Sequence, residues 1–524
     1  MSSESTIVGD VLLRTQARNR GDHPLLICDS ECISYADADR LSARLARGLI
    51  GLGAGKGSHV GLLYPNGVAF VVGMLAASRV GAVVVPFSTF ATARELREQL
   101  VDSDTEILLA AASFRSHDYV QQLTDLLPGS DLDSGDRLFD VAAPQLRHVI
   151  FDLARLHRLA ETVDERLLTA MQNDLDGSDP LTIVYTSGTT AAPKGVVHTH
   201  AALLNHQRNL NTIRGLTAAD RLFCNSPFFW IGGLGFALLA TLLAGSTLVC
   251  SNAEDAGQTL DLLEAERPTV TNGFAAGVAH LARHPTFGRR DLSSMRRGNL
   301  YPIMAPEVRP ADPELRHSML GLTEAGSVVL IDADETDQPE HRRGSFGKPA
   351  PAVETKIVDP ESGMPVEDGA LGELYIRGPC LMQGYYKRSR EECFDADGWF
   401  RTGDLVATDN DGFVYYIGRR GSMIKTAGAN VSPAEVEQAI AKVTGGGVAH
   451  VFGIPDPDRG QLVAAVITLD NGAAFDETRL RRQLAAELSA YKIPRRFAAI
   501  PVADVPLLAS GKADVQQLKS LFDA

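Results

Sequence analysis

Cysteine is scarce in this sequence, and the few cysteines follow no ligand pattern. The 524 residues include six cysteines, none of which forms a Cys-x-x-Cys pair or joins a histidine cluster. They are Cys28, Cys32, Cys224, Cys250, Cys380 and Cys393. This spacing gives no basis for a disulfide framework or a zinc site, so we expect a protein of the reducing cytoplasm.

Positive charge is also in short supply. Lysine and arginine number 50 against 65 aspartates and glutamates, which gives a formal net charge of -15. General binding to nucleic acid or to anionic membranes needs a basic surface, so we expect no nucleic-acid partner. Hydrophobic residues make up 44% of the chain and charged residues 22%. That composition is typical of a globular protein, and the length predicts two to four domains.

A membrane anchor is not expected either. The first residues, MSSESTIVGD, lack the basic start and apolar stretch of a signal peptide. The run Leu222–Ala253 has no charged side chain and is long enough to cross a bilayer. Asn225, Pro227 and several glycines interrupt it, however, which predicts a buried loop, helix and strand rather than an integral membrane segment.

Apolar runs alternate with amphipathic segments in the first part of the chain. The runs 58–64, 80–86 and 105–110 are predominantly apolar, and the second is rich in β-branched residues, so we predict strands there. The segment Ala38–Leu52 carries leucines at helical spacing and ends in glycines, which predicts a helix. The expected fold class is α/β, with a large amino-terminal domain of several subdomains.

The chain changes character near Gly418, where Gly-Arg-Arg-Gly-Ser interrupts two better-formed stretches. Beyond it, Ser432 and Pro433 are a good helix start, and the runs 448–454 and 463–469 are strand-like. A large domain beside a small one is typical of enzymes that close over a substrate. We predict an amino-terminal domain at 1–417, a hinge at 418–422 and a mobile α+β carboxy-terminal lid at 423–524.

The stretch 183–197 has the chemistry of a phosphate-binding loop. Two apolar flanks enclose hydroxyl residues, glycines and a single lysine, Lys194. Small residues let backbone N–H groups approach an anion, hydroxyls donate hydrogen bonds, and the lysine adds positive charge. The alternative is a solvated Ser/Thr-rich hairpin. It would explain the polar residues but not the ending Pro193-Lys194-Gly195.

This loop resembles the signature Thr-Ser-Gly-Thr-Thr-Gly-x-Pro-Lys-Gly of the superfamily of acyl-CoA synthetases, luciferases and peptide-synthetase adenylation domains. The resemblance covers nearly the whole chain and is strongest to the fatty-acyl and aryl-CoA ligases. Further matching motifs follow in family order, at Tyr64-Pro-Asn66, Gly321–Ala325, Phe400–Leu405, Gly418-Arg419 and Ser510–Lys512. The resemblance implies AMP-forming chemistry with ATP, Mg²⁺ and coenzyme A as co-substrate.

It also implies roles for single residues. Glu324 resembles the carboxylate that holds Mg²⁺, Thr323 can donate to the α-phosphate, and Lys512 resembles the catalytic lysine of the lid. Asp404 resembles the carboxylate that accepts hydrogen bonds from the ribose hydroxyls, with Arg419 as its partner. The expected nucleotide- and coenzyme-binding residues are Thr186, Ser187, Gly188, Thr189, Thr190, Lys194, Leu320, Gly321, Asp404, Arg419, Lys425 and Gly428.

Five positions depart from the family pattern. Ala191 replaces a glycine of the phosphate loop, and Leu320 replaces the tyrosine that packs on adenine. The stretch 297–304 contains no Gly-Gly-Ala loop, which leaves the pocket wall undefined. Trp230 stands where many CoA ligases have histidine, and Gly421 occupies the hinge position that commonly holds Asp or Lys.

The substrate is expected to be a small apolar carboxylic acid, fatty or aromatic. Trp230, Gly273 and Phe274 are the predicted pocket residues, and a plain core tryptophan is an equal alternative for Trp230. His198, His200 and His206 are spaced like metal ligands, but no cysteine or carboxylate completes a set, so capping or core packing is predicted. No heptad pattern or single apolar face indicates an oligomer.

These observations predict an ATP-dependent, AMP-forming acid:CoA ligase. The first alternative keeps adenylation and changes the acceptor to an amine, a carrier-protein thiol or nitrite used in diazotisation of an aryl amine. The second alternative is a degenerate nucleotide-binding protein without catalysis, which Ala191 and Leu320 suggest. Retention of Lys194, Glu324, Asp404 and Lys512 speaks against it.

Overall fold

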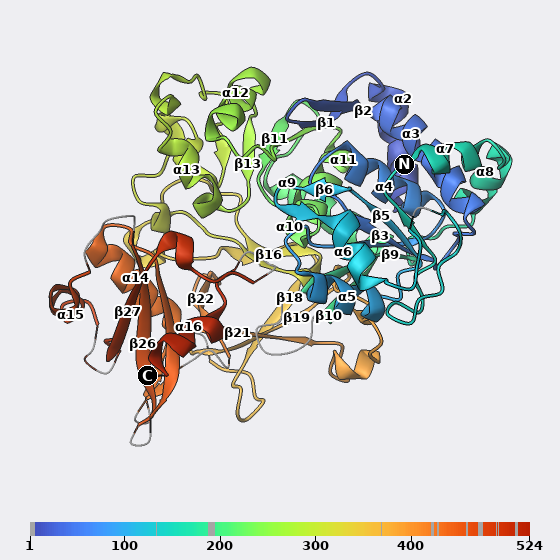
Figure 1. Cartoon of the computed structure of the whole chain (residues 1–524). Coiled ribbons are helices and arrows are strands. Elements are labelled where there is room, and N and C mark those ends of the chain that lie inside the picture. Colours follow the sequence, from blue (N-terminus) through green and yellow to red (C-terminus); the bar gives the residue numbers. More distant parts are fainter. Residues whose placement is uncertain are drawn as a thin grey trace. The chain divides into compact units, whose positions relative to one another are not determined.

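The structure is a computed structural model of the chain. It describes residues 6–132, 134–186, 194–367, 369–420, 424–426, 429–456, 459–469, 475–488, 490, 492–508 and 512–523. The chain folds into two compact units, each with its own sheets and core (Figure 1). The first is Met1–Glu354 with Arg377–Ala396, and the second is Thr355–Ile376 with Asp397–Ala524. The predicted division into 1–417, 418–422 and 423–524 stays a prediction.

Two large sheets form the first unit. One has the strand order β14-β13-β11-β12-β1-β2, and all neighbours are parallel except β1 and β2. Its strands are β1 (Pro24–Cys28), β2 (Glu31–Ser34), β11 (Arg221–Cys224), β12 (Thr247–Cys250), β13 (Val270–Asn272) and β14 (Arg297–Gly298). Because β11, β12, β13 and β14 run in one direction, their carboxyl ends share one edge, which is where open α/β sheets bind ligands.

The other large sheet has the order β20-β10-β9-β4-β3-β5-β8. Its strands are β3 (His59–Leu63), β4 (Val83–Pro86), β5 (Ile107–Ala110), β8 (His148–Ile150), β9 (Pro180–Thr186), β10 (Lys194–Thr199) and β20 (Gly384–Tyr385). The three strands predicted from apolar runs are β3, β4 and β5, and they are neighbours in parallel pairing. The α/β prediction is therefore confirmed in both composition and topology.

Helices α3 (Tyr35–Gly51) and α4 (Val68–Arg79) contribute much of the main hydrophobic core of this unit. Helix α3 is the predicted helix, and it begins three residues earlier than the leucine pattern indicates because the Ser34 side chain caps it by accepting from Asp37 N. The other α-helices of the unit are α1 (Val8–Asp10), α2 (Arg18–Arg20), α5 (Ala93–Asp102), α6 (Tyr119–Leu126), α7 (Ala154–Ala160), α8 (Glu165–Asn173), α9 (His200–Ile213), α10 (Ile231–Gly233), α11 (Ala240–Ala244), α12 (Ala256–Glu266) and α13 (Ala279–Ala282).

The long uncharged run 222–253 folds as predicted. Strand β11 leads into helix α10, which continues without a break as the π-helical stretch 234–239 and then as α11, before β12 ends the run. Most of its side chains are buried. None of the helices within the described residues is long and apolar enough to cross a membrane.

A small three-stranded sheet completes the framework of the first unit. It consists of β15 (Leu320–Leu322), β16 (Ser327–Ile331) and β17 (Lys348–Pro349), and a separate hairpin is formed by β6 (Ser113–Phe114) and β7 (His117–Asp118). Between β15 and β16 the chain makes one 3₁₀ turn, Thr323–Ala325. The predicted metal and phosphate contacts, Thr323 and Glu324, lie on this turn.

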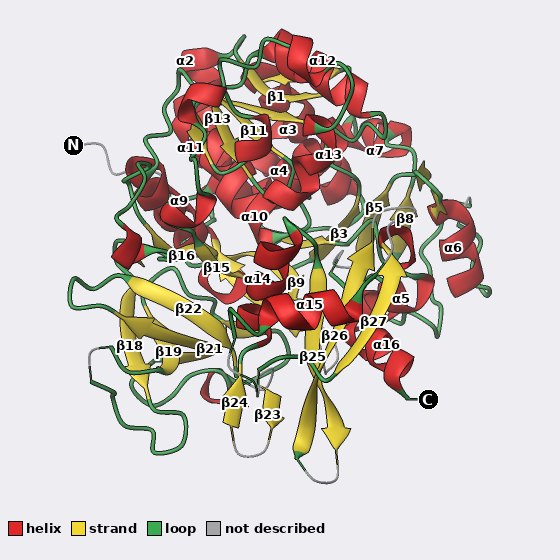
Figure 2. Cartoon of the chain, turned by 90° about the vertical axis from the view of Figure 1, so that its left-hand side faces the viewer, coloured by secondary structure: helices red, strands yellow, loops and turns green. Residues whose placement is uncertain are grey.

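The second unit has two sheets of its own (Figure 2). The first contains β18 (Glu354–Val358), β19 (Gly372–Arg377), β21 (Phe400–Thr408) and β22 (Val414–Arg419); the second contains β23 (Ile424–Thr426), β24 (Ala429–Val431), β25 (Ala449–Asp456), β26 (Gly460–Leu469) and β27 (Arg496–Pro501). Its helices are α14 (Pro433–Thr444), α15 (Glu477–Leu484) and α16 (Val515–Lys519). Ser432 caps α14 as predicted.

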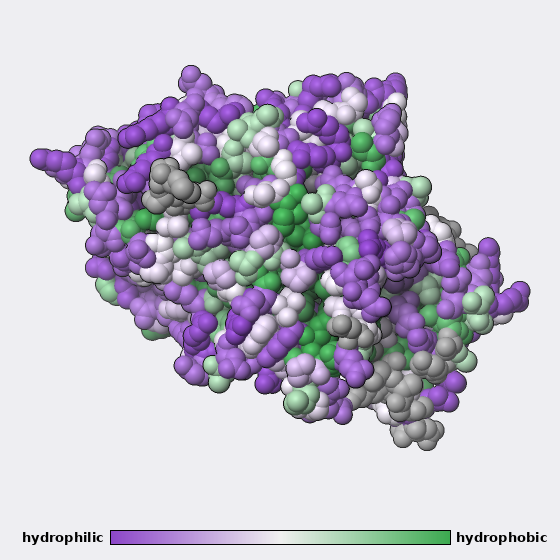
Figure 3. Space-filling view, turned by 180° about the vertical axis from the view of Figure 1, so that it is seen from behind, coloured by the Kyte–Doolittle hydropathy of each residue, from purple (hydrophilic) through white to green (hydrophobic). Residues whose placement is uncertain are grey.

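Strand β26 is buried on both faces. Val463, Ala465 and Ile467 join a core with α14 and α15, whereas Ala464 and Val466 join a second core with Leu518 of α16. Alternate side chains of a strand point to opposite faces, so a continuous apolar run is what this position requires. Hydrophilic residues cover most of the coloured face in Figure 3, with hydrophobic ones in small groups between them.

Candidate active site

Thr186 and Lys194 lie directly opposite each other at the loop end of the β9–β10 hairpin. Of the residues in this loop that are predicted to bind the nucleotide, these are the two that the structure describes. Ser187, Gly188, Thr189 and Thr190 lie outside the described residues, as does the departure at Ala191. The antiparallel pairing therefore fixes both ends of the loop segment at one register.

Tyr385 connects Lys194 to Glu324. Strand β20 pairs with β10 and places Tyr385 opposite Val196. The Lys194 ammonium lies 5.0 Å from the centroid of the tyrosine ring, and the tyrosine hydroxyl donates to Glu324 Oε1 over 2.7 Å. One side chain thus joins a cation and a carboxylate that stand 130 positions apart in the chain.

The sequence analysis missed Tyr385. The only local signal is the aromatic pair Tyr385-Tyr386 after Gly384, and such a pair is common in cores. Its position follows from the pairing of two strands that are distant in sequence, β10 and β20.

Glu324 is almost fully buried, with 9% of its surface exposed. Its backbone carbonyl accepts from Met382 N over 2.8 Å, and one carboxylate oxygen accepts from Tyr385. A carboxylate has four lone-pair sites, so capacity for a cation remains. This donor suits Mg²⁺, a hard cation that keeps several waters and takes further ligands from phosphates. No set of three or more His, Cys, Asp or Glu among the described residues could hold a metal ion.

Helix α9 and the strand before it brace the Thr323–Val328 turn. His198 Nε2 donates to Thr323 O over 2.6 Å, and His206 Nε2 donates to Val328 O over 2.8 Å. Gln207 Nε2 adds a bond of 3.0 Å to Gly326 O. Burial lowers the pKa of both histidines to about 4, so they are neutral at pH 7.

His200 has a similar structural position. Its Nδ1 accepts from Val8 N over 3.2 Å, and burial lowers its pKa to about 4. Each of the three histidines is thus buried and bonded to backbone, the arrangement that core packing predicts. Their spacing in the sequence arises because His198 lies near the end of strand β10, whereas His200 and His206 lie on helix α9.

The predicted acid pocket lies at the carboxyl ends of β11 and β13. Trp230 follows β11, and Gly273 and Phe274 follow β13. The Trp230 ring lies 5.6 Å from the rings of both Phe229 and Phe274, edge to face in each case. Phe229 is buried, Trp230 is half-buried and Phe274 is 55% exposed. The three rings therefore run from the core to the surface.

Gly273 is held between two asparagines. Its N–H donates to Asn299 Oδ1 over 3.1 Å, and Asn299 Nδ2 donates back to its carbonyl over 2.8 Å. The adjacent Phe274 N donates to Asn225 Oδ1 over 2.9 Å. Gly273 has φ 143°, and a Cβ there would lie 1.8 Å from Asn225 Oδ1. Only glycine fits, so the backbone after β13 is rigidly placed.

The wall expected to carry a Gly-Gly-Ala loop is built differently. After β14 the chain makes three 3₁₀ turns, at Tyr301–Ile303, Pro306–Val308 and Pro313–Leu315, each with proline in its first positions. Residues 299–319 are all described and contain no α-helix. Leu320 is half-buried and Gly321 exposed in β15. The roles of both in nucleotide binding stay predictions.

In the second unit, Asp404 and Arg419 are paired across β21 and β22. Arg419 Nε lies 3.5 Å from Asp404 Oδ1, and Arg419 Nη2 donates to Thr402 O over 3.1 Å. Asp404 is 4% exposed, and its N–H donates to the Thr402 hydroxyl oxygen over 3.0 Å. The two predicted ribose contacts are therefore neighbours.

The structure gives fewer contacts for the remaining predicted residues of this unit. Lys512 is exposed, and its carbonyl accepts from Leu508 N over 2.7 Å. Lys425 lies in strand β23, and Gly428 and Gly421 lie outside the described residues. Thr323, Glu324 and Lys194 belong to the first unit and Lys512 to the second, so their joint action stays a prediction.

Comparisons with known proteins agree with this geometry. The sequence profile of the AMP-binding enzyme family matches residues 13–386, and that of the AMP-binding enzyme C-terminal domain matches 435–512. A feruloyl-CoA synthase of an Amycolatopsis species is 31% identical over 92% of this chain and 92% of its own length. A mitochondrial medium-chain acyl-CoA ligase of Bos taurus is 29% identical over 98% of this chain and 87% of its own.

Solved structures show the same architecture. The crystal structure of ATP-bound MatB from Rhodopseudomonas palustris superposes with a TM-score of 0.82, at 25% identity and with 99% of both chains covered. The fold prediction is thereby confirmed for both domains. The chain belongs to the AMP-binding enzyme family, and it is an ATP-dependent, AMP-forming ligase of the acyl-CoA synthetase type, which works with Mg²⁺ and coenzyme A.

Proposed function

We propose that this ligase activates a small carboxylic acid with an apolar body, fatty or aromatic, as its acyl adenylate and transfers the acyl group to coenzyme A. The observation that carries the proposal is the Lys194–Tyr385–Glu324 connection, because it gathers a phosphate-binding cation and a metal-binding carboxylate. The rings of Trp230 and Phe274 supply apolar surface at the carboxyl edge of the first sheet. The names of the relatives above cover both acid types.

In the first step, a substrate carboxylate oxygen attacks the α-phosphorus of ATP, and the bond to pyrophosphate breaks. Lys194 holds the departing phosphates, and the Thr323 hydroxyl donates to the α-phosphate. Mg²⁺, held by Glu324, would neutralise charge on the phosphates. Lys512 stabilises the charge that builds between carboxylate and phosphate, an electrostatic contribution of roughly several kcal/mol.

Asp404 and Arg419 hold the nucleotide rather than react with it. The buried Asp404 carboxylate accepts hydrogen bonds from both ribose hydroxyls, and Arg419 orients it. Positioning of this kind raises the rate by fixing the α-phosphorus in line with the attacking oxygen.

In the second step, the thiol sulfur of coenzyme A attacks the acyl carbon. The bond from that carbon to the phosphate oxygen breaks, AMP leaves with the electron pair, and the thiol proton passes to AMP or solvent. We propose that the 418–422 hinge turns the lid, so that the loop 425–430 replaces Lys512 at the site.

A panel of acids tests the proposal. Pyrophosphate release is measured with ATP, Mg²⁺ and fatty or aromatic acids, with and without coenzyme A, and acyl-CoA is followed by mass spectrometry. AMP and thioester formed in equal amounts would support it. Pyrophosphate without thioester would instead indicate an amine, a carrier-protein thiol or nitrite as the second reactant.

A further inference from the structure

A cavity of about 240 Å³ lies beside the acid pocket in the first unit. It runs along β13 and the edge strand β14, and Arg214, Phe236, Asn272, Asn299 and Met319 are among its lining residues. Sequence analysis assigned it nothing. Tyr301, in the first of the three 3₁₀ turns after β14, also lines the cavity.

Arg214 is a cation without an anion. Its Nη2 donates to Asn211 Oδ1 over 3.0 Å and to Phe236 O over 2.8 Å, and its Cζ lies 3.9 Å from the centre of the Phe236 ring. Within the part of the chain that the structure describes, it forms no ion pair, and its Nε is buried without a partner. Burial lowers its pKa to about 9. Such a charge is costly unless something compensates it.

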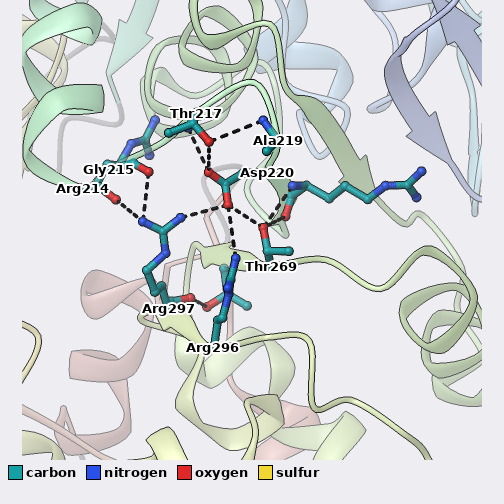
Figure 4. A network of polar contacts seen from close by, with 10 residues as sticks. Arg214, Gly215, Thr217, Ala219, Asp220, Thr269, Arg296 and Arg297 are labelled. Carbon is teal, nitrogen blue, oxygen red and sulfur yellow. Dashed lines mark hydrogen bonds and ion pairs between the residues drawn. The ribbon is translucent and has the colours of Figure 1, made fainter.

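The other charged side chains along this wall have partners. Arg297 Nη2 donates to Asp220 Oδ1 over 2.9 Å and its Nη1 to the carbonyls of Arg214 and Gly215 (Figure 4). Burial raises the pKa of Asp220, but bonds from Thr217 and Thr269 and the charge of Arg297 outweigh it, so the net pKa is lowered. Asp220 is therefore ionised and holds Arg297. Arg297 in turn fixes the backbone at Arg214 and Gly215 through hydrogen bonds to their carbonyls.

The other charged side chains that line the cavity are Arg316, Asp332, Asp334 and Glu335. Arg316 pairs with Asp337, and Asp334 accepts from Thr336. Asp334 and Glu335 are exposed, where solvent and salt screen their charge. Asp332, which is half-buried, accepts from Asp334 N over 2.9 Å. Among the arginines that line the cavity, Arg297 and Arg316 have carboxylate partners, and Arg214 has none within the described residues.

The cavity is close to the residues of the proposed reaction. Phe236 and Trp230 are on the same helical stretch, and Gly235 between them packs on Gly326, where a Cβ would lie 2.9 Å from the Gly326 carbonyl. Asn299 lines the cavity and also holds Gly273. An acid seated between Trp230 and Thr323 would therefore point its far end along this helix, towards Arg214.

We infer that the preferred substrate is a dicarboxylic acid with an apolar body, whose second carboxylate pairs with Arg214. This inference rests on the proposed function. The guanidinium has a planar face on Phe236 and donors left for a carboxylate, which suits a charge-assisted bond. Binding would give a half-buried cation a carboxylate partner, whereas a monocarboxylic acid would leave it unpaired.

The test compares matched acids of three lengths: succinate with butyrate, adipate with hexanoate, and suberate with octanoate. Pyrophosphate release gives kcat/KM for each. For at least one length the diacid should be preferred by about tenfold or more. The Arg214→Met variant should lose that preference, because kcat/KM should fall about tenfold more for the diacid than for the matched monoacid, and Arg214→Lys should recover part of it. Arg221→Gln removes another half-buried arginine, which pairs with Glu266 outside the cavity, and should change nothing.

If Arg214 has only a structural role, the result is different. The melting temperature of Arg214→Met then falls, and the ratio of kcat/KM for the diacid to that for the monoacid is the same as in the wild type. That outcome, or a preference for the monoacid at every length, overturns the inference. If no acid releases pyrophosphate, the proposed function fails instead. Thermal shift with the diacids alone then decides the inference, because binding to Arg214 predicts a rise in melting temperature that Arg214→Met lacks, and equal shifts refute it.

Discussion

The Tyr385 hydroxyl donates to Glu324 over 2.7 Å while its ring faces the Lys194 ammonium at 5.0 Å. The same tyrosine side chain therefore positions both the Glu324 carboxylate and the Lys194 ammonium. A tyrosine offers a polar tip and an apolar, electron-rich face, so it can orient an anion and a cation at once.

Removal of that hydroxyl should weaken catalysis without unfolding the site. In Tyr385→Phe the ring stays beside Lys194, but Glu324 loses a donor, and we expect adenylation to fall about tenfold, the usual scale for a hydrogen bond to a charged group. Pyrophosphate release titrated with Mg²⁺ measures it, and the half-saturating Mg²⁺ concentration should rise. The matched control is Tyr386→Phe, whose hydroxyl donates to Asp104. Equal activity of the two variants would contradict the role of Tyr385.

Lys512 should matter for one half-reaction only. In Lys512→Ala we expect adenylation to fall by about 100-fold or more, because a stabilising charge is lost in the transition state. Thioester formation from supplied acyl-AMP should change little. Lys519→Ala, in the same unit, is the control. Equal losses in both half-reactions would count against alternation of the lid.

Replacement of Asp404 should weaken the binding of ATP through its ribose hydroxyls. Asp404→Asn keeps the size of the side chain and removes the charge beside Arg419, so KM for ATP should rise by about tenfold. Wild-type enzyme should prefer ATP to 2′-deoxy-ATP, and the variant should lose much of that preference. Asp411→Asn changes an exposed residue of the same hairpin and should leave both values as they are.

Stability should fall in mild acid because of the buried histidines. The pKa of His206 is about 4 in the folded chain and about 6.5 when unfolded. Between these values the unfolded chain binds the extra proton, so this stability is present above pH 6.5 and is lost as the pH falls towards 4, by up to about 1.4 kcal/mol per pH unit.

The variant His206→Gln keeps a donor for Val328 O and cannot take up that proton. Denaturant unfolding at pH 7 and pH 5 should therefore show a smaller loss of stability than in the wild type. The exposed residue His341 gives the control, His341→Gln, which should reproduce the wild-type loss. An unchanged loss in His206→Gln would show that His206 does not titrate on unfolding.

The sequence by itself determined the fold class and much of the order of the chain. Apolar runs located β3, β4 and β5, and leucines at helical spacing located α3, since these elements bury one face or both in a core. The Ser432-Pro433 start of α14 was equally readable, because caps are local. Motif order indicated the enzyme class, which the comparisons established.

Only the tertiary structure decided which side chains meet. Tyr385 reaches Glu324 and Lys194 because β20 pairs with β10, and the cavity at Arg214 is lined by segments far apart in the chain, among them Phe236, Asn299 and Met319. Neither follows from local pattern. Contacts between distant segments depend on how sheets pair and how helices pack, and a sequence window contains neither, whereas capping, periodicity and motif spacing are decided within a few neighbouring residues.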